Sequence, residues 1–81
     1  MNVEVKLFAV ARQLAGCETA CVELPEAATV AQLRVALVAQ HPPLAEVMQH
    51  VMFAVDAEYA DEQTSIPHDA EVACIPPVSG G

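Results

Sequence analysis

Apolar and polar residues alternate near both ends of the chain with the two-residue period of strands that bury one face. "VEVKLFAV" predicts a first strand whose inward side chains are Val3, Val5 and Leu7. "CVELP" predicts a second strand with Val22 and Leu24 facing inward. The polar, glycine-containing "ARQLAGCETA" between them is predicted to be a connection.

The middle of the chain changes to helical spacing. Thr29 is a plausible N-cap, and Val30, Leu33 and Leu37 recur on one helix face. "HPP" at 41–43 should end this helix, because proline removes a donor and its ring clashes with the preceding turn. A shorter helical segment is predicted from the spacing of Leu44, Val47, Met48 and Val51.

Two more strands complete the pattern. "MFAVDAEYA" predicts a third strand running into a turn near residues 56–58, "DEQTSIPHD" has turn composition, and "AEVACI" predicts the last strand. The order strand, strand, helix, strand, strand in 81 residues predicts one α+β domain with a helix packed across a mixed sheet, in which the last strand could pair beside the first.

Charge narrows the choice of partners. Eleven Asp and Glu against three Lys and Arg give a net charge of −8, which repels nucleic acid and anionic membranes. The acidic surface either steers the domain toward basic patches on other proteins or serves solubility alone. No apolar run approaches the ~20 residues of a membrane span, and no basic leader precedes the first strand, so we expect a cytoplasmic protein.

We expect no metal site. The three cysteines are too few for an all-cysteine iron–sulfur cluster and are predicted to be reduced, partly buried apolar residues: Cys17, Cys21 and Cys74. The three histidines are far apart in sequence and are predicted to be solvated or to cap helices: His41, His50 and His68.

The last six residues predict an extended tail, 76–81, behind a domain formed by residues 1–75. The tail consists of Pro76, Pro77, Val78, Ser79, Gly80 and Gly81. Proline fixes φ and glycine has no Cβ, so this tail could reach on the order of 20 Å into a narrow site on another protein.

The terminal carboxylate is the candidate reactive group. With a pKa of about 3.3–3.7 it is an anion at neutral pH and must be activated before a nucleophile can attack it. The only glycines are Gly16, Gly80 and Gly81, so the chain has no glycine-rich loop to hold ATP phosphates. We therefore expect no bound cofactor, and ATP to be used by an activating partner.

Four stretches, "FAVARQLAG", "TVAQLRVAL", "FAVDAEY" and "EVACIPPVSGG", resemble the small subunits of molybdopterin synthase along the whole chain. The resemblance implies a β-grasp, ubiquitin-like fold with a flexible Gly-Gly tail. It implies that an adenylyltransferase similar to ubiquitin-activating enzymes adenylates Gly81, and that sulfur from a donor protein converts it to a thiocarboxylate. This sulfur would build the dithiolene of molybdopterin from cyclic pyranopterin monophosphate during molybdenum cofactor biosynthesis.

The resemblance also implies a partner, the large subunit of a two-subunit sulfurtransferase, with two copies of each chain. The tail would enter the large subunit's active site, and this chain would not be catalytic alone. Alternation puts Phe8 and Ile75 side by side on the outer face, as a partner surface or under a covering loop. Arg12 matches the family's arginine and either contacts the partner or forms a surface ion pair.

Two departures from the family pattern concern local structure. Cys74 replaces a bulkier apolar residue, and "IPHDAEV" lacks the glycine expected in the turn before the last strand, which suggests another turn type. Two other functions stay open: a sulfur carrier for another pathway, such as thiamine synthesis, and a β-grasp interaction module whose tail is never activated.

Overall fold

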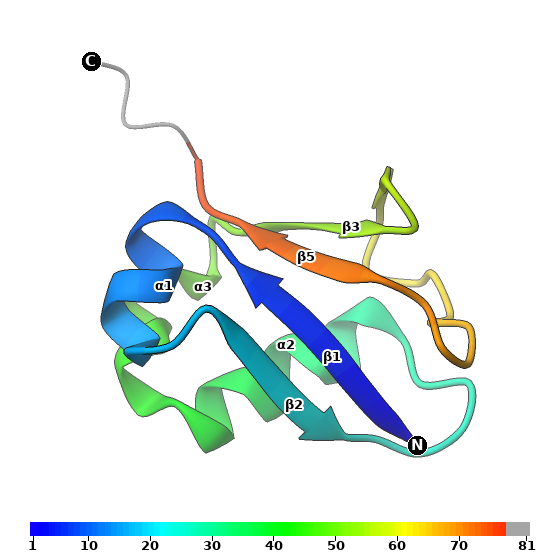
Figure 1. The fold of residues 1–81 in the computed structure, drawn as a ribbon. Helices are drawn as coiled ribbons and strands as arrows, with labels where there is room; N and C mark the ends of the chain where they lie inside the picture. Colours follow the sequence, from blue (N-terminus) through cyan, green and yellow to red (C-terminus); the bar gives the residue numbers. More distant parts are fainter. Residues whose placement is uncertain (78–81) are drawn as a thin grey trace.

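A five-stranded mixed sheet forms the centre of the computed structural model, which describes residues 1–77 (Figure 1). The strand order is β2-β1-β5-β3-β4. The strands are β1 (Asn2–Leu7), β2 (Thr19–Glu23), β3 (Met52–Val55), β4 (Glu58–Ala60) and β5 (Val72–Ile75). The central pair, β1 and β5, is parallel, and the other pairs are antiparallel. The predicted α+β class is confirmed.

One long helix crosses the inner face of this sheet, behind it in Figure 1. The helices are α1 (Ala9–Ala15), α2 (Val30–Gln40), the 3-10 turn η1 (Pro42–Leu44) and α3 (Ala45–Met48). Thr29 caps α2 as predicted: its hydroxyl accepts a hydrogen bond from the Gln32 amide, and the Gln32 side chain accepts one from the Thr29 amide at 2.9 Å. The helix ends at Gln40, two residues before Pro42.

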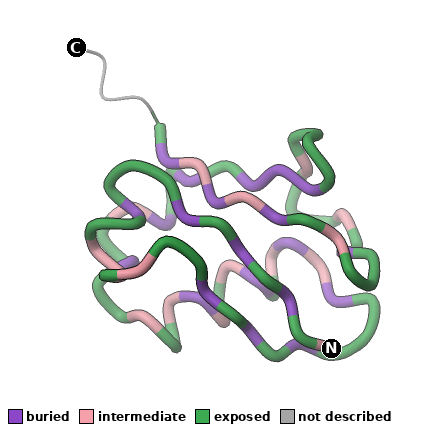
Figure 2. The backbone as a smooth tube through the Cα atoms, viewed as in Figure 1, coloured by how far each residue is buried: buried purple, intermediate pink, exposed green. Residues whose placement is uncertain are grey.

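The core lies between the sheet and α2, and Figure 2 shows buried residues alternating with exposed ones along β1 and β2. Its largest fully buried side chains are Phe53, Leu33, Leu37, Leu44 and Ile66. Ile66, alone in a stretch of turn composition, also packs into the core, and its amide donates to the Ala28 carbonyl at 2.8 Å. No helix among residues 1–77 has the length and apolar character needed to cross a membrane.

The sequence pattern did not predict two short elements, α1 and β4. The predicted connection after the first strand is wrong, since it contains α1, which buries Ala11 alone and ends at Gly16 with a φ of 75°. A helix with one fully buried residue leaves no 3.6-residue apolar period to detect. The other missed element is β4, three residues that return from the turn at Asp56 and Ala57, whose φ angles of 50° and 69° fit a tight hairpin.

Arg34 fastens α2 to the segments on either side of it. Its guanidinium donates to the carbonyls of Met48 and Val51, forms an ion pair with Glu62, and lies 5.1 Å from the centre of the Phe53 ring. One side chain thus ties the main helix to the end of α3, the start of β3 and the loop after β4. No local sequence pattern marks this role, because every partner is distant along the chain.

The turn before the last strand replaces the expected glycine with Asp69. Asp69 has a φ of 63°, the left-handed conformation that glycine tolerates best and aspartate adopts more readily than most residues. Asp69 therefore adopts the backbone conformation expected of the glycine, and the fold is unchanged.

Candidate functional site

The base of the C-terminal segment is fixed to the first strand. The Phe8 amide donates to the Cys74 carbonyl at 3.3 Å, which extends the β1–β5 pairing one step beyond Leu7 opposite Cys74. Pro76 is buried and Pro77 is exposed. The packed body therefore continues one residue into the predicted tail. The predicted division at residue 75 stays a prediction, as do the roles of Val78, Ser79, Gly80 and Gly81, which lie outside the described residues.

Beside this base, the outer face of the sheet carries large apolar side chains. Phe8 is 46% exposed and Ile75 is half-buried next to it, as the alternation predicted. Met52 lies opposite Ile75 in the β3–β5 pairing and is 52% exposed. Tyr59, 67% exposed, shares this face because its partner Ala54 pairs in turn with Ala73 of β5.

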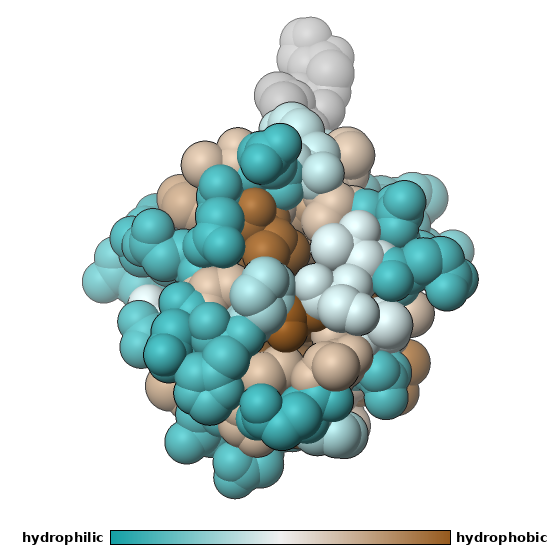
Figure 3. Space-filling view, turned by 90° about the vertical axis from the view of Figure 1, so that its right-hand side faces the viewer, coloured by the Kyte–Doolittle hydropathy of each residue, from teal (hydrophilic) through white to brown (hydrophobic). Residues whose placement is uncertain are grey.

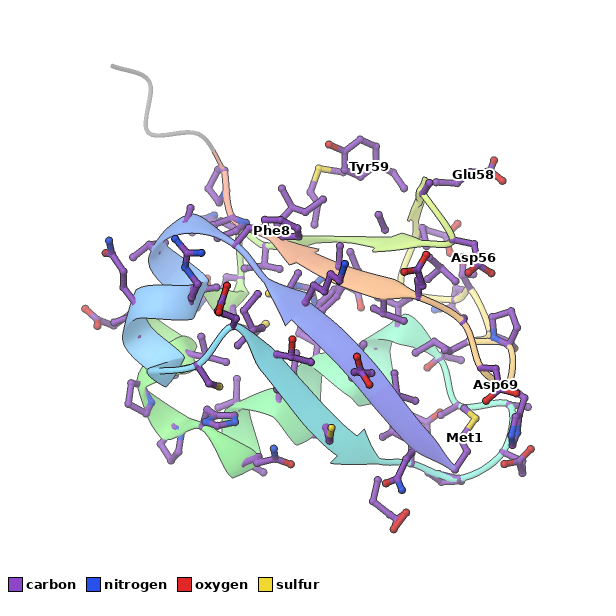
Figure 4. All side chains as sticks on the ribbon, viewed as in Figure 1. Met1, Phe8, Asp56, Glu58, Tyr59 and Asp69 are labelled. Carbon is purple, nitrogen blue, oxygen red and sulfur yellow. The ribbon has the colours of Figure 1, made fainter. Side chains whose placement is uncertain are left out.

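We call these four residues, Phe8, Met52, Tyr59 and Ile75, the outer patch. Figure 4 shows Tyr59 projecting from the β3–β4 hairpin and Phe8 at the end of β1. Phe8 and Ile75 were predicted from the sequence, and Met52 and Tyr59 were not. The third strand, "MFAV", is apolar throughout, so only the pairing of Met52 with Ile75 shows which of its side chains lie beside the last strand on the outer face.

The other half of the same face is polar. The outward positions of β1 and β2 hold Asn2, Glu4, Lys6, Thr19, Cys21 and Glu23. Figure 3 shows the end of the molecule formed by the two turns before β4 and β5, where polar side chains surround a small apolar strip. Figure 4 places Met1, Asp56, Glu58 and Asp69 there. Large exposed apolar side chains on the sheet are thus gathered beside the tail base.

Two cations lie at the edge of the outer patch. Lys6 and Arg12 line a shallow groove of about 250 Å³ together with Phe8 and Glu18. The Arg12 guanidinium is 3.7 Å from the Glu18 carboxylate, and both side chains are mostly exposed. The ion pair that was one alternative for Arg12 therefore exists. An exposed pair contributes at most about 1 kcal/mol, so a partner's carboxylate can compete for this arginine.

The cysteines differ in environment. Cys74 is fully buried, and burial raises the pKa of its thiol to about 11, against an opposing effect of the nearby Arg34 charge. A neutral buried thiol is a poor nucleophile. Cys17 is half-buried, but the prediction of burial is wrong for Cys21, which is exposed on an edge strand. In residues 1–77 all three are free thiols.

The histidines and the other side chains that could bind a metal do not cluster among residues 1–77. His41 is the C-cap residue of α2, and His50 and His68 are exposed, as predicted. Within residues 1–77, no three side chains of His, Cys, Asp or Glu gather closely enough to hold a metal ion.

The mixed sheet and the helix across it define a β-grasp protein of the ubiquitin-like class. The chain belongs to the ThiS family, which matches residues 5–81. It is 36% identical over 81 residues to the molybdopterin synthase sulfur carrier subunit of Arabidopsis thaliana, covering all of this chain and 84% of that protein.

Two solved structures share the fold. SAMP1, small archaeal modifier protein 1 of Haloferax volcanii, superposes with a TM-score of 0.88 at 34% identity, over 100% of both chains. A chain of the complex of subunits 1 and 2 of the molybdopterin-converting factor of Helicobacter pylori gives a TM-score of 0.70 at 22% identity, again over 100% of both. At that identity the second likeness supports the fold alone.

Proposed function

We propose that this protein is the sulfur carrier of molybdopterin synthase in molybdenum cofactor biosynthesis. The observation that carries the proposal is the similarity, over the whole chain, to a molybdopterin synthase sulfur carrier subunit. The aligned region covers the whole chain and so extends through Gly80 and Gly81, on which the proposed chemistry depends. The fold contributes a rigid body that holds the base of the tail at one edge.

The proposed chemistry takes place at Gly81. Its carboxylate attacks the α-phosphate of ATP on an activating enzyme, which gives an acyl-adenylate and releases pyrophosphate. A persulfide of a donor protein then displaces AMP and gives an acyl disulfide. A second thiol cleaves its S–S bond, which leaves a thiocarboxylate on Gly81 and a disulfide between that thiol and the donor. The thiocarboxylate sulfur attacks a carbon of the pterin precursor and displaces an oxygen substituent, and hydrolysis of the resulting thioester leaves sulfur on the pterin and restores the Gly81 carboxylate. This chain supplies the nucleophile, and the partner supplies the pocket and the acid–base groups.

The outer patch is proposed to dock the large subunit. Ordering a residue's backbone costs roughly 1 to 2 kcal/mol, so six tail residues would cost on the order of 6 to 12 kcal/mol before any contact forms. A body-to-body contact beside the tail can offset that cost. Phe8 and Tyr59 have the aromatic character of binding hot spots, and Lys6 and Arg12 form a charged rim. The A. thaliana relative is named as a subunit of molybdopterin synthase, which supports a partner of this kind here. Two copies of each chain, an adenylyltransferase and a sulfur donor complete the proposed system.

A second candidate is protein modification, favoured by the likeness to an archaeal modifier protein. It would begin with the same acyl-adenylate but end with an amide bond to another protein. A carrier for another pathway would form the same thiocarboxylate and differ only in the acceptor. A non-covalent interaction module would never be activated.

Intact mass spectrometry separates these functions. Incubation with ATP, a sulfur donor and the host's activating enzyme should replace one oxygen of the chain by sulfur. Adding the large subunit and cyclic pyranopterin monophosphate should then return the original mass and produce molybdopterin. Covalent adducts with other proteins would favour the modifier, and an unchanged mass would favour the interaction module.

Two variants control for the site of reaction. Deleting Gly81, or adding one alanine after it, should abolish sulfur transfer and leave the far-UV circular dichroism spectrum and melting temperature unchanged. Full product formation by either variant would refute a reaction at the terminal carboxyl.

A further inference from the structure

Helix α2 presents a second apolar surface, on the side of the helix that faces away from the sheet. Val35 is 72% exposed, more than any residue of the outer patch. Its neighbours along the same side, Ala31, Val38 and Ala39, are half-buried or exposed. A surface helix normally shows a polar outer face. This one, "VAQLRVALVAQ", carries apolar residues all round.

Val35 forms a ridge between two apolar grooves. One groove, of about 460 Å³, is lined by Leu24, Ala31, Gln32, Val35 and Ala36. The other, of about 330 Å³, is lined by Arg34, Val35, Val38, Ala45, Met48 and Gln49. Helices pack by placing the ridge of one into the groove of another. A ridge that is flanked by its own grooves has the shape that a two-fold contact requires, because each copy must offer both parts.

The charge of α2 allows a second acidic copy to approach this face. None of the eleven acidic residues lies on α2. Its single charged residue, Arg34, has its guanidinium committed to the Met48 and Val51 carbonyls and to Glu62. Two chains of net charge −8 repel each other, so a contact needs a face with few unpaired carboxylates. Two exposed carboxylates adjoin groove residues in the sequence, Glu46 beside Ala45 and Glu23 beside Leu24, whereas Glu62 is paired with Arg34.

We propose that this face, the α2 ridge, forms a weak symmetric homodimer in which Val35 of each copy fits a groove of the other. The contact involves one face of an 11-residue helix, well below the area of a standard stable interface, so its dissociation constant should be on the order of 0.1 to 1 mM. The outer patch lies on the opposite face of the sheet. It stays free in the dimer, and a docked partner and a second copy can bind at once.

Sedimentation velocity of the full chain, under reducing conditions so that exposed Cys21 forms no disulfide, tests the dimer. The weight-average mass should rise with protein concentration toward that of two chains. Raising the salt from about 0.01 to about 1 M shortens the Debye length from about 30 to about 3 Å and should strengthen the dimer, because the two chains repel. A basic partner bound at this face would show the opposite dependence on salt.

Val35→Glu should raise the dissociation constant at least about tenfold, because it places an unpaired carboxylate in the contact. Its exposure in the monomer leaves the core intact, and circular dichroism verifies folding. Val35→Leu should preserve or tighten the dimer. Val10→Glu is the matched control, since Val10 is an exposed valine on α1 and should leave association unchanged.

Three results would overturn the proposal. A chain that stays monomeric up to about 1 mM lacks the dimer, and the face then belongs to another partner. A dimer that Val35→Glu leaves intact, or that Tyr59→Asp removes, is formed elsewhere. A dimer that weakens as salt rises is held by opposite charges and not by the α2 ridge.

Discussion

Apolar side chains are buried on the inner face of the sheet and partly exposed on its outer face. Two adjacent residues of β5 show this difference. Cys74 points inward, is fully buried and packs with the core beneath α2. Ile75 points outward and is half-buried beside exposed Phe8 and Met52. The inner face holds the domain together. The outer face keeps large apolar groups at the surface in one half only, the half beside the tail base, as a binding surface would require.

Deletion of an inner side chain should have the largest effect on stability. Phe53→Ala removes a fully buried ring and the aromatic face beneath Arg34, and should reduce the free energy of unfolding by about 3 to 5 kcal/mol. Urea denaturation followed by circular dichroism measures the change. Tyr59→Ala, an aromatic deletion on the outer face of the neighbouring strand, should stay within about 0.5 kcal/mol of wild type. Equal losses would mean that the outer face is part of the core.

Changes on the outer patch should instead weaken binding. Tyr59→Asp and Phe8→Ala should each cost about 2 kcal/mol of affinity for the large subunit, roughly thirtyfold, with the melting temperature nearly unchanged. Ile75→Asp should weaken binding too, with some loss of stability because Ile75 is half-buried. Isothermal titration calorimetry measures the affinity, and Glu4→Gln on the polar half is the control. A lower melting temperature with unchanged affinity would place these side chains among the stabilising residues.

The sequence predicted the inner face better than the outer one. The alternation in β1 and the spacing of Leu33 and Leu37 in α2 follow directly from burial, so the α+β architecture and its main helix were found. The outer patch depends on which strands pair. Phe8 and Ile75 could be paired because the first and last strands were predicted as neighbours. Tyr59 could not, because its strand has three residues and its position depends on long-range register.

Other misses share this cause. Arg34 contacts carbonyls 14 and 17 residues away, and no local pattern marks such a partner. Helix α1 is short, and Ala11 is its one buried residue. Neither an apolar period nor an N-cap side chain therefore indicates this helix in the sequence. Sequence patterns report burial well and report pairing between distant segments poorly. The residues proposed to form the binding surface depend on that pairing.

The buried thiol of Cys74 and the exposed thiol of Cys21 should also differ in how they make stability depend on pH. Burial raises the pKa of Cys74 from its ordinary 9.0 to about 11, so the folded state holds this proton more tightly than the unfolded state. The stability that the neutral thiol contributes is complete below pH 9 and is lost as the pH rises from about 9 to about 11. The loss should reach about 2 to 3 kcal/mol in urea titrations.

Two variants test the assignment to Cys74. Cys74→Val should flatten the dependence on pH between 9 and 11, whereas Cys21→Val on the outer face should leave it unchanged. A thiol reagent at pH 8 should label Cys21 quickly and Cys74 only after unfolding. Rapid labelling of Cys74 in the native protein would contradict its burial.

The smallest expected effect concerns the hairpin that holds Tyr59 on the outer face. Ala57 sits in its turn with a φ of 69°, where an alanine Cβ crowds the following carbonyl at a cost of roughly 1 to 2 kcal/mol that glycine avoids. Glycine also gains freedom in the unfolded chain, which cancels part of the benefit. Ala57→Gly should therefore stabilise the domain by about 0.5 kcal/mol and raise the melting temperature by about 2 to 4 °C. Ala39→Gly, at an exposed helical alanine of α2, should lower stability by about 1 kcal/mol. If both glycines destabilise equally, the hairpin turn is unstrained, and Tyr59 is held on the outer face by strand pairing alone.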